Sequence, residues 1–335
     1  MRIAYFHTGT IFTSWSIFSL AGIMRQAGHE VLDACIPTNE HGAVVHQLGT
    51  MEYKRILATL PTLQDLQTCD VVFVAGPEYI SVWLNVLYGD QFHKLKAKRA
   101  AFYLESSARE DVKFQYAQFT RQFQVNFFPD PEDARHFNAH HLTWYIDTTM
   151  FKPCRLEGEP GHVCDPDCEV RRQREKTFSV AFVGSLYNKR LQFLLKLLPM
   201  IPEVDFQANG VMVRDLSGER QQMAAELLAD NLRRIKIHVA LPSNNVTMMV
   251  PRPFETLASG TFLITYRTKD NPFKDGEHCR VYDPEEPEEL AELIRYYLAH
   301  DEERERIARN GYEEVRQKYS WKTRIGEVLD IISRS

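Results

Sequence analysis

Short apolar runs alternate with helix-length amphipathic stretches along most of the chain. A representative run, residues 70–76, reads Asp-Val-Val-Phe-Val-Ala-Gly and ends at a glycine. Continuous apolar runs of this length are typical of strands buried on both faces of a parallel sheet. The first half of the chain is expected to contribute strands over residues 3–6, 30–35, 70–76, 99–104, 124–128 and 141–145. A helix over residues 15–26 is expected between the first two strands.

An irregular segment interrupts this alternation. Residues 152–176 hold prolines and glycines among charged residues without an apolar period, which favours an interdomain connection or a surface excursion. The alternation then restarts, with strands expected over residues 178–183, 204–207, 235–239 and 261–265. Helices are expected over residues 190–198, 287–298, 301–319 and 321–332.

Strands that alternate with helices predict an α/β protein with two doubly wound, Rossmann-like domains. The first domain is expected over residues 1–150, a linker or excursion over 151–177, and the second domain over 178–320. Residues 321–335 are expected to form a C-terminal helix that packs back on the first domain. Two such sheets that face one another place their carboxyl ends at one cleft, the edge at which open α/β sheets bind ligands.

The composition is that of an ordinary globular protein, with 44% hydrophobic and 25% charged residues in a chain of 335. A net charge of −5 argues against a general affinity for polyanions. No apolar run approaches the roughly 18 residues of a membrane-spanning helix. The first residues also lack the apolar core of a signal peptide. The cytoplasm is therefore the expected location.

Four potential metal ligands lie close together in the irregular segment, namely Cys154, His162, Cys164 and Cys168. Cysteine and histidine side chains of this number are able to form a tetrahedral zinc site. Their spacing is not one of the familiar zinc patterns, and the surrounding sequence is typical of a linker. A reduced loop without a metal is the favoured interpretation.

The most informative chemistry lies in residues 252–261, Arg-Pro-Phe-Glu-Thr-Leu-Ala-Ser-Gly-Thr, which predict a helix that ends at a glycine. A helix N-terminus in an α/β domain favours anions. Arg252 is then placed to bind phosphate and Glu255 to accept hydrogen bonds from a sugar diol, while Thr256 is a weaker candidate for phosphate. Glu255 as a simple helix-capping charge and Arg252 as a structural ion pair are the alternatives. The pattern predicts a nucleotide-sugar site.

A second turn carries residues of the same kind. Gly184 and Ser185 follow a buried strand, and Lys189 and Arg190 come in the next turn. A glycine permits a close approach of the backbone, and the two cations are able to meet phosphate oxygens. Asn244, in a polar loop, is a further candidate for the donor pocket or else an ordinary loop residue.

The first domain is expected to supply the acceptor side and the catalytic base. His7 follows the first strand, and an imidazole is able to remove a proton from a hydroxyl near neutral pH. Glu105, at the end of the fourth strand, is the competing candidate for the base. A histidine at a strand end is also commonly a packed structural residue, so both interpretations of His7 stay open.

Three segments together resemble the soluble glycosyltransferases related to the spore maturation protein CgeB, within the broader GT-B group. They are Ala-Phe-Val-Gly-Ser-Leu-Tyr-Asn-Lys-Arg at 181–190, the segment 252–261, and a tail with Tyr282-Asp283, Glu289-Leu290 and Arg-Ile-Ala-Arg-Asn-Gly at 306–311. The resemblance implies that Glu255 binds ribose hydroxyls and that Arg252 binds the donor diphosphate. Many retaining GT-B enzymes carry a second glutamate eight positions earlier, where this chain has Thr247. The stereochemistry of transfer is therefore not predicted.

The leading hypothesis is a hexosyl- or related glycosyltransferase that moves a sugar from a nucleotide diphosphate donor to an acceptor hydroxyl. No cofactor beyond the nucleotide-sugar co-substrate is expected, and no metal is required if the cations neutralise the leaving diphosphate. Polysaccharide, protein, metabolite and nucleobase acceptors all stay open, as does the oligomeric state. The alternatives are a nucleotide-sugar epimerase or hydrolase on the same fold, and a non-catalytic nucleotide-sugar-binding module.

Overall fold

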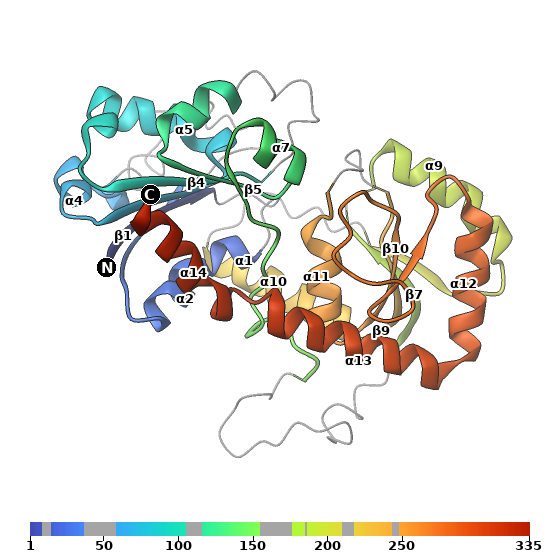
Figure 1. Ribbon diagram of the computed structural model, residues 1–335. Coiled ribbons are helices and arrows are strands. Elements are labelled where there is room, and N and C mark those ends of the chain that lie inside the picture. Colours follow the sequence, from blue (N-terminus) through green and yellow to red (C-terminus); the bar gives the residue numbers. More distant parts are fainter. Residues whose placement is uncertain are drawn as a thin grey trace, which may run out of the picture. The chain divides into compact units, whose positions relative to one another are not determined.

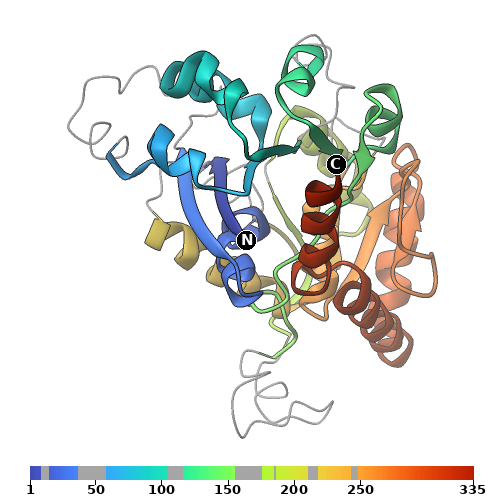
Figure 2. The same ribbon diagram turned by 60° about the vertical axis from the view of Figure 1, so that its left-hand side comes forward.

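The structure is a computed structural model and is drawn as a ribbon in Figure 1 and, turned, in Figure 2. It describes residues 1–8, 15–36, 58–104, 116–154, 176–184, 186–209, 218–242 and 248–335. These residues form two compact units. Unit 1 consists mainly of Met1–Thr143 and Trp321–Ser335, and unit 2 consists mainly of Trp144–Met212 and Gln222–Ser320. The chain therefore passes from one unit to the other near residues 144 and 321, and residues 218–221 are also grouped with unit 1.

Unit 1 is built on a parallel sheet with the strand order β2-β1-β3-β4-β5-β6. The strands are β1 (Arg2–Thr8), β2 (Glu30–Ile36), β3 (Val71–Ala75), β4 (Lys98–Phe102), β5 (Val125–Phe128) and β6 (His140–His141). From β1 the chain continues to β2 on one side of β1, and then crosses to β3 on the other side. Unit 1 thus has the strand order of a doubly wound sheet, with its switch point between β1 and β3.

Helices cover both faces of this sheet, because successive strand side chains point to opposite faces and both sets are apolar. Ala4 and Phe6 belong to the core cluster that also contains Ile80 and Leu84 of helix α5. The Tyr5 side chain points to the other face, where its hydroxyl donates a hydrogen bond to the Ile17 carbonyl at 2.7 Å. The helical elements of unit 1 are α1 (Trp15–Phe18), α2 (Leu20–Gln26), α4 (Leu63–Gln67), α5 (Pro77–Tyr88), η2 (Gly89–Lys94), η3 (Thr120–Gln122), α7 (Pro131–His136) and α14 (Trp321–Arg334).

The C-terminal helix α14 packs on the sheet of unit 1. The Trp321 ring is fully buried, with its centroid 6.2 Å from that of Phe102 on β4. Figure 1 shows α14 on the face of the sheet opposite to α5. The sequence predicted this helix within two residues of its observed end at Arg334.

Unit 2 contains a second parallel sheet, with the order β11-β10-β9-β7-β8. Its strands are β7 (Phe178–Val183), β8 (Phe206–Asn209), β9 (Ile235–Val239), β10 (Phe262–Tyr266) and β11 (Arg280–Tyr282). Its helical elements are α9 (Asn188–Leu197), η4 (Leu198–Met200), α10 (Gly218–Arg233), α11 (Pro251–Ala258), α12 (Pro287–Ala299) and α13 (Asp301–Lys318). The expected fold class of two doubly wound α/β domains is confirmed.

Two expected elements differ from those observed, and one observed strand was not expected. The helix expected over 15–26 is interrupted at Ser19 and forms α1 and α2. The strand expected over 141–145 ends at His141, because the chain leaves the sheet and Ile146 forms a bridge with Ser320 instead. Strand β11 was not predicted, since its three residues are too short to give an apolar run.

Helix α11 is fixed in unit 2 by two close approaches at glycines. A Cβ atom at Gly260, which has a φ of +67°, would lie 2.9 Å from Pro153. A Cβ atom at Gly311 on α13 would collide with the His278 carbonyl and would lie 2.7 Å from the Leu257 side chain of α11. The two glycines therefore allow the segment before the second domain and helix α13 to pack closely around α11.

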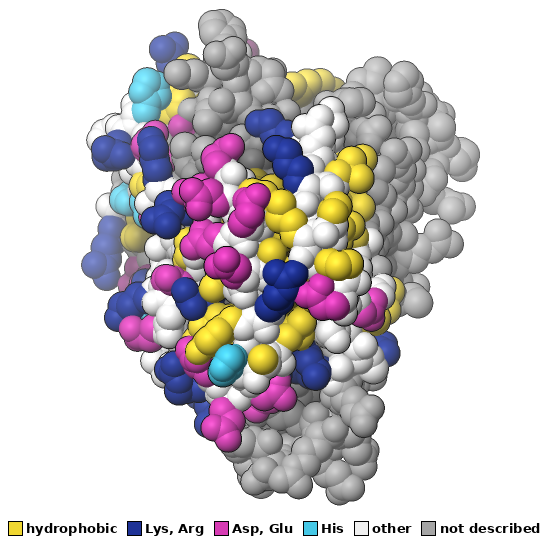
Figure 3. All heavy atoms as spheres, turned by 90° about the vertical axis from the view of Figure 1, so that its right-hand side faces the viewer, with side chains coloured by type: hydrophobic (Ala, Val, Ile, Leu, Met, Phe, Trp, Pro, Cys, Tyr) yellow, Lys and Arg dark blue, Asp and Glu magenta, His cyan; other side chains and the backbone are white. Residues whose placement is uncertain are grey.

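The outer face of unit 2 formed by α9 and α12 carries charges of both signs with hydrophobic side chains between them (Figure 3). Neither sign dominates the described part of this face. Among the described helices, none is long and apolar enough to cross a membrane.

Candidate active site

The candidate site lies at the switch point of the sheet in unit 2. Strand β7 has β8 on one side and β9 on the other, so the chain leaves the carboxyl ends of β7 and β9 in different directions. Open α/β sheets bind ligands in the crevice outside such strand ends. Gly184 follows β7 and leads to α9, and residues 240–242 follow β9 on the way to α11. Both turns singled out in the sequence therefore meet at this edge.

Gly184 lies close to the side chains of Phe182 and Arg190. A Cβ atom at this position would lie 2.9 Å from the Phe182 ring and 3.5 Å from Nη1 of Arg190. The glycine thus leaves room for the Phe182 ring, and the Arg190 guanidinium lies at ordinary contact distance beside it. Ser185 and Asn244 lie outside the described residues.

Arg190 is a cation with a fixed position. Its guanidinium carbon lies 4.4 Å from the centroid of the Tyr187 ring and 5.2 Å from that of Phe182, within the range of cation–π attraction. Its Nε donates a hydrogen bond to the Pro242 carbonyl at 3.2 Å. Burial lowers the pKa of Arg190, and the nearby Arg252 guanidinium lowers it further, yet arginine remains charged in proteins. Lys189, one residue earlier on α9, is exposed.

Arg252 and Glu255 pair with one another across the first turn of α11. Arg252 Nη1 donates to Glu255 Oε2 at 2.5 Å. The Glu255 side chain is 3% exposed, whereas that of Arg252 is 29% exposed. Within the described part of the chain, the other N–H groups of the Arg252 guanidinium have no partner. The pair is thus a buried carboxylate with a half-exposed cation beside it.

The N-terminus of α11 offers fewer backbone donors than an ordinary helix. Pro251 and Pro253 occupy two of its first three positions, and proline has no N–H group. The N-cap residue Val250 has no side chain able to cap the helix. Positive charge at this edge therefore comes mainly from the guanidiniums of Arg190 and Arg252 rather than from helix N–H groups.

His238 on β9 connects the two turns, and the sequence reasoning missed it. The imidazole is fully buried. Nε2 accepts a hydrogen bond from the Val183 N–H at 3.3 Å, and Nδ1 lies 2.9 Å from Thr256 Oγ1. Burial, and then the charges of Arg252 and Arg190, lower the pKa of His238 to about 3. The available signal was a histidine within the short strand segment Ile-Lys-Ile-His-Val at 235–239.

The Thr256 hydroxyl is engaged within the protein. It donates a hydrogen bond to the Arg252 carbonyl at 2.8 Å and faces Nδ1 of His238. The residue is fully buried. A contact between this hydroxyl and phosphate would require both bonds to be rearranged, so its role as a phosphate ligand stays a prediction.

On the side of unit 1, His7 lies within β1, which extends to Thr8. The residue is 1% exposed, and its Nε2 lies 3.1 Å from Asp33 Oδ1 on β2. Its ring stacks on Tyr5 and meets the edge of Phe18. A carboxylate beside an imidazole orients the ring as in catalytic triads, but packing of this kind also suits a structural histidine. The role of His7 as base stays a prediction.

Glu105 lies outside the described residues, but its neighbour Leu104 is described. The Leu104 N–H donates a hydrogen bond at 2.7 Å to Oε1 of Glu78, in the first turn of α5. Glu78 therefore fixes the end of the β4 segment that leads to Glu105. The sequence reasoning did not single out Glu78.

No metal centre is visible among the residues that the structure describes, where no three His, Cys, Asp or Glu side chains cluster suitably. Of the four potential ligands in the irregular segment, only Cys154 is described, as a buried free cysteine. His162, Cys164 and Cys168 lie outside the described residues.

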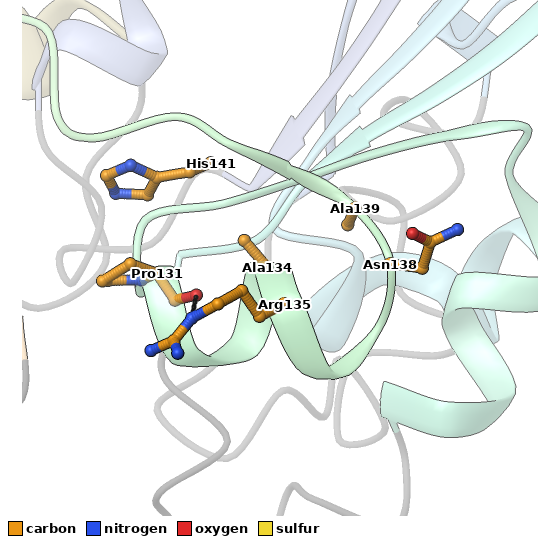
Figure 4. Close-up of a pocket in the computed structure, with 6 residues that line it drawn as sticks. All are labelled: Pro131, Ala134, Arg135, Asn138, Ala139 and His141. Carbon is orange, nitrogen blue, oxygen red and sulfur yellow. Dashed lines mark hydrogen bonds between the residues drawn. The ribbon is translucent and has the colours of Figure 1, made fainter.

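A hollow of about 390 Å³ lies elsewhere, in unit 1, beside α7 and β6. Figure 4 shows that its lining includes Arg135, whose guanidinium points back toward its own helix, and His141. Arg135 Nε donates to the Pro131 carbonyl at 3.3 Å. None of the candidate residues from the sequence lines this hollow.

Comparisons with known proteins agree with the site in unit 2. Residues 189–330 match a family described as glycosyl transferase-like. This stretch is less than half of the chain, and it includes Arg190, His238, Arg252 and Glu255. A search of curated protein sequences gave no match.

Solved structures with a similar fold extend over the whole chain. Sucrose-phosphate synthase from Thermosynechococcus elongatus is 14% identical with a TM-score of 0.65, and the alignment covers 100% of both chains. HepE from Anabaena, in complex with UDP and glucose, is 10% identical with a TM-score of 0.66 and the same coverage. An alpha-glucosyltransferase in complex with UDP-glucose and DNA is 12% identical with a TM-score of 0.64, covering 99% of both chains.

The fold and the site together define a class. The chain has the GT-B fold of two parallel-sheet α/β domains, and residues 189–330 match the glycosyl transferase-like family. The more specific resemblance to the CgeB-related enzymes stays a prediction.

Proposed function

We propose that this protein is a glycosyltransferase that takes a sugar from a nucleoside diphosphate donor and binds that donor at the carboxyl edge of β7 and β9. The single observation that carries the proposal is the convergence at this switch point of Arg190, bonded to the Pro242 carbonyl after β9, and the Arg252–Glu255 pair at the start of α11. A diphosphate is the ligand that two adjacent guanidiniums suit best. The UDP complexes of HepE and of the alpha-glucosyltransferase support a UDP-sugar as the first donor to test.

The site residues have distinct roles in the proposed reaction. The bond between the anomeric carbon and the diphosphate oxygen breaks, and Arg190 and Arg252 neutralise the charge that develops on the leaving diphosphate. Glu255 accepts hydrogen bonds from the ribose hydroxyls. The acceptor oxygen forms the new bond to the anomeric carbon, and its proton passes to a base, for which His7 and Glu105 are the candidates.

The donor sugar, the need for a metal and the acceptor define the proposed reaction more closely. We take the sugar to be a hexose and the chain to be of the CgeB-related type. The transfer needs no metal, because the guanidiniums provide the charge that a divalent cation otherwise supplies. The acceptor hydroxyl belongs to a polysaccharide, a protein, a metabolite or a nucleobase.

A thermal-shift screen tests donor binding. UDP, GDP and ADP are each added with EDTA or with Mg²⁺, and the melting temperature is followed. A ligand present at 100 times its Kd stabilises the folded protein by about 2.7 kcal/mol, which corresponds to several degrees for a chain of this size. We expect one nucleoside diphosphate to raise the melting temperature equally with EDTA and with Mg²⁺. A shift that requires Mg²⁺ contradicts the metal-independent part, and the absence of any shift contradicts the proposal.

Analysis of the donor alone separates transfer from other reactions of nucleotide sugars. The protein is incubated with the nucleotide sugar whose diphosphate gives the largest shift, and the sugar is followed by proton NMR. Slow release of free sugar and an unchanged configuration are expected, since no acceptor is present. Rapid epimerisation or hydrolysis would identify an epimerase or a hydrolase instead.

A further inference from the structure

The hydrogen-bond partners of His238 determine which of its two ring nitrogens carries the proton. The Val183 N–H is only able to donate, so Nε2 must carry the lone pair. Nδ1 then carries the proton and donates to Thr256 Oγ1 at 2.9 Å. The Thr256 hydroxyl proton in turn goes to the Arg252 carbonyl at 2.8 Å. The chain of three bonds works only with a neutral imidazole in this one tautomer.

This chain of bonds joins the two walls of the candidate site. Val183 is the last residue of β7 and directly precedes Gly184. Thr256 and Arg252 belong to the first turns of α11, which also carries Glu255. The imidazole thus spans from the turn that leads to Arg190 to the turn that holds Arg252. The imidazole and its two hydrogen bonds therefore set the separation between these two turns.

The position of His238 makes a purely apolar replacement costly for the site. On the neighbouring strand β10, the residue in register with His238 is Leu263, which is fully buried. A leucine would fill the volume but leave the Val183 N–H and the Thr256 hydroxyl without their partner. Buried polar groups that lose a partner move toward another, so the two turns would shift relative to one another.

We propose that His238 is a positioning residue for donor binding, whose two hydrogen bonds hold the turn after β7 and the first turn of α11 at the separation that a diphosphate between Arg190 and Arg252 requires. This inference rests on the proposed function, since it concerns the same donor. It assigns to His238 no contact with the substrate.

Three substitutions at this position separate the two bonds. His238→Leu removes both. His238→Asn keeps an N–H near the place of Nδ1 and so retains the bond to Thr256, whereas His238→Gln places an amide oxygen near the place of Nε2 and retains the acceptor for Val183. His278→Leu is the matched control. His278 is also buried in unit 2, with Lys274 and Glu277 rather than site residues as its partners.

The readout is the Kd for UDP from isothermal titration, with the melting temperature of each ligand-free variant beside it. We expect His238→Leu to weaken UDP binding by about tenfold or more, and His238→Asn and His238→Gln to weaken it by less. His278→Leu is expected to melt at a lower temperature and still bind UDP within about twofold of the wild type. A partial rescue by the amides, with no effect of the control, is not expected of a residue that only supports folding.

Two results would overturn the inference, and they differ from the failure of the proposed function. A folded His238→Leu variant that binds UDP within about twofold of the wild type overturns the positioning role alone. If that variant does not fold, the same result for both amide variants overturns it. A wild-type protein that binds none of UDP, GDP and ADP overturns the proposed function and the inference with it.

Discussion

At the scale of single residues, the candidate site combines charges whose surroundings are very different. Arg190 is held between two rings, Arg252 is half-exposed, and the Glu255 carboxylate is almost completely buried beside it. His238 is fully buried beside them as a neutral ring. Two cations with one carboxylate leave a net positive charge at the edge of the sheet. This charge is what a diphosphate would compensate.

The first prediction separates the binding of the ribose from the binding of the diphosphate. Glu255→Gln is expected to weaken UDP binding by about tenfold, because an amide accepts the ribose hydroxyl bonds less well than a carboxylate. The same change is expected not to weaken the binding of inorganic pyrophosphate, because it removes a negative charge near the phosphates. Titration of both ligands into both proteins measures the difference.

Glu314→Gln serves as the control for this prediction. Glu314 is also a largely buried carboxylate that pairs with a cation of its own helix, Lys318, at 2.9 Å. It lies on α13, outside the candidate site. Equal losses of UDP and pyrophosphate affinity in Glu255→Gln would mean that Glu255 acts only by holding Arg252 and does not contact the ribose.

The second prediction concerns the pH dependence of stability. The pKa of His238 is about 3 in the folded protein, whereas an unperturbed imidazole has a pKa of 6.5, so between these values the unfolded chain binds a proton that the folded protein does not. Stability therefore falls as the pH drops below about 6.5, by about 2 kcal/mol between pH 7 and pH 5 from this group alone. His238→Asn removes that contribution.

Urea unfolding at several pH values measures this effect. The wild type is expected to lose more unfolding free energy between pH 7 and pH 5 than His238→Asn does, even though the variant is less stable at pH 7. Parallel pH profiles for the two proteins would show that the imidazole is not held in its neutral form.

At the scale of elements, helix α11 is the part that presents the site, and its packing explains why it lies where it does. It follows β9, begins with two prolines in three positions, and packs against α13 where Gly311 leaves room for Leu257. The orientation of Arg252 and Glu255 therefore depends on a helix–helix contact on the far side of α11.

The third prediction compares two glycines within helices. Alanine normally stabilises a helix interior by up to about 1 kcal/mol relative to glycine. Gly311→Ala is expected to destabilise instead, by about 1–3 kcal/mol, because the new methyl group meets the His278 carbonyl and Leu257. Gly326→Ala on α14, where the added atom meets nothing within 4 Å, is expected to stabilise the protein. Thermal unfolding gives both signs, and effects of the same sign would contradict the close packing of α11 and α13.

The sequence predicted most of these elements and only part of the site. A continuous apolar run such as 71–75 revealed a parallel strand, because burial on both faces leaves a clear signal. The Arg252–Glu255 segment was visible because both residues belong to one helical turn. The connection through His238 was not visible, since it joins Val183, His238 and Thr256, which are far apart in sequence. Pro251 and Pro253 also reduce the number of backbone N–H groups at the N-terminus of α11, where the sequence had favoured an anion site.

At the scale of the whole molecule, one chain contributes several segments to each of two units, and its main crossings lie near residues 144 and 321. The last crossing returns the chain to unit 1, where α14 completes the cover of the sheet through Trp321. Unit 1 thus depends on the C-terminal residues, whereas the described residues of the candidate donor site, such as Val183, His238 and Thr256, belong to unit 2.

The fourth prediction follows from this division. Trp321→Ala is expected to cost about 3–5 kcal/mol of stability, because a fully buried ring is replaced by a cavity. Hydrogen–deuterium exchange is expected to increase in β4 and α2, which α14 contacts, and to stay unchanged in β9 and α11. UDP affinity is expected to be retained under conditions in which the variant is folded. Loss of protection in β9 and α11 of equal size would show that the two units unfold as one.

The central claim is that the carboxyl edge of β7 and β9 binds the diphosphate of a donor, and a crystal structure tests it most directly. The protein is crystallised with whichever of UDP, GDP and ADP gives the largest thermal shift. We predict that the diphosphate lies within hydrogen-bonding distance of the Arg190 and Arg252 guanidiniums, with the ribose hydroxyls at Glu255. A nucleotide bound elsewhere, or bound at this edge with its phosphates directed away from both guanidiniums, would contradict the account.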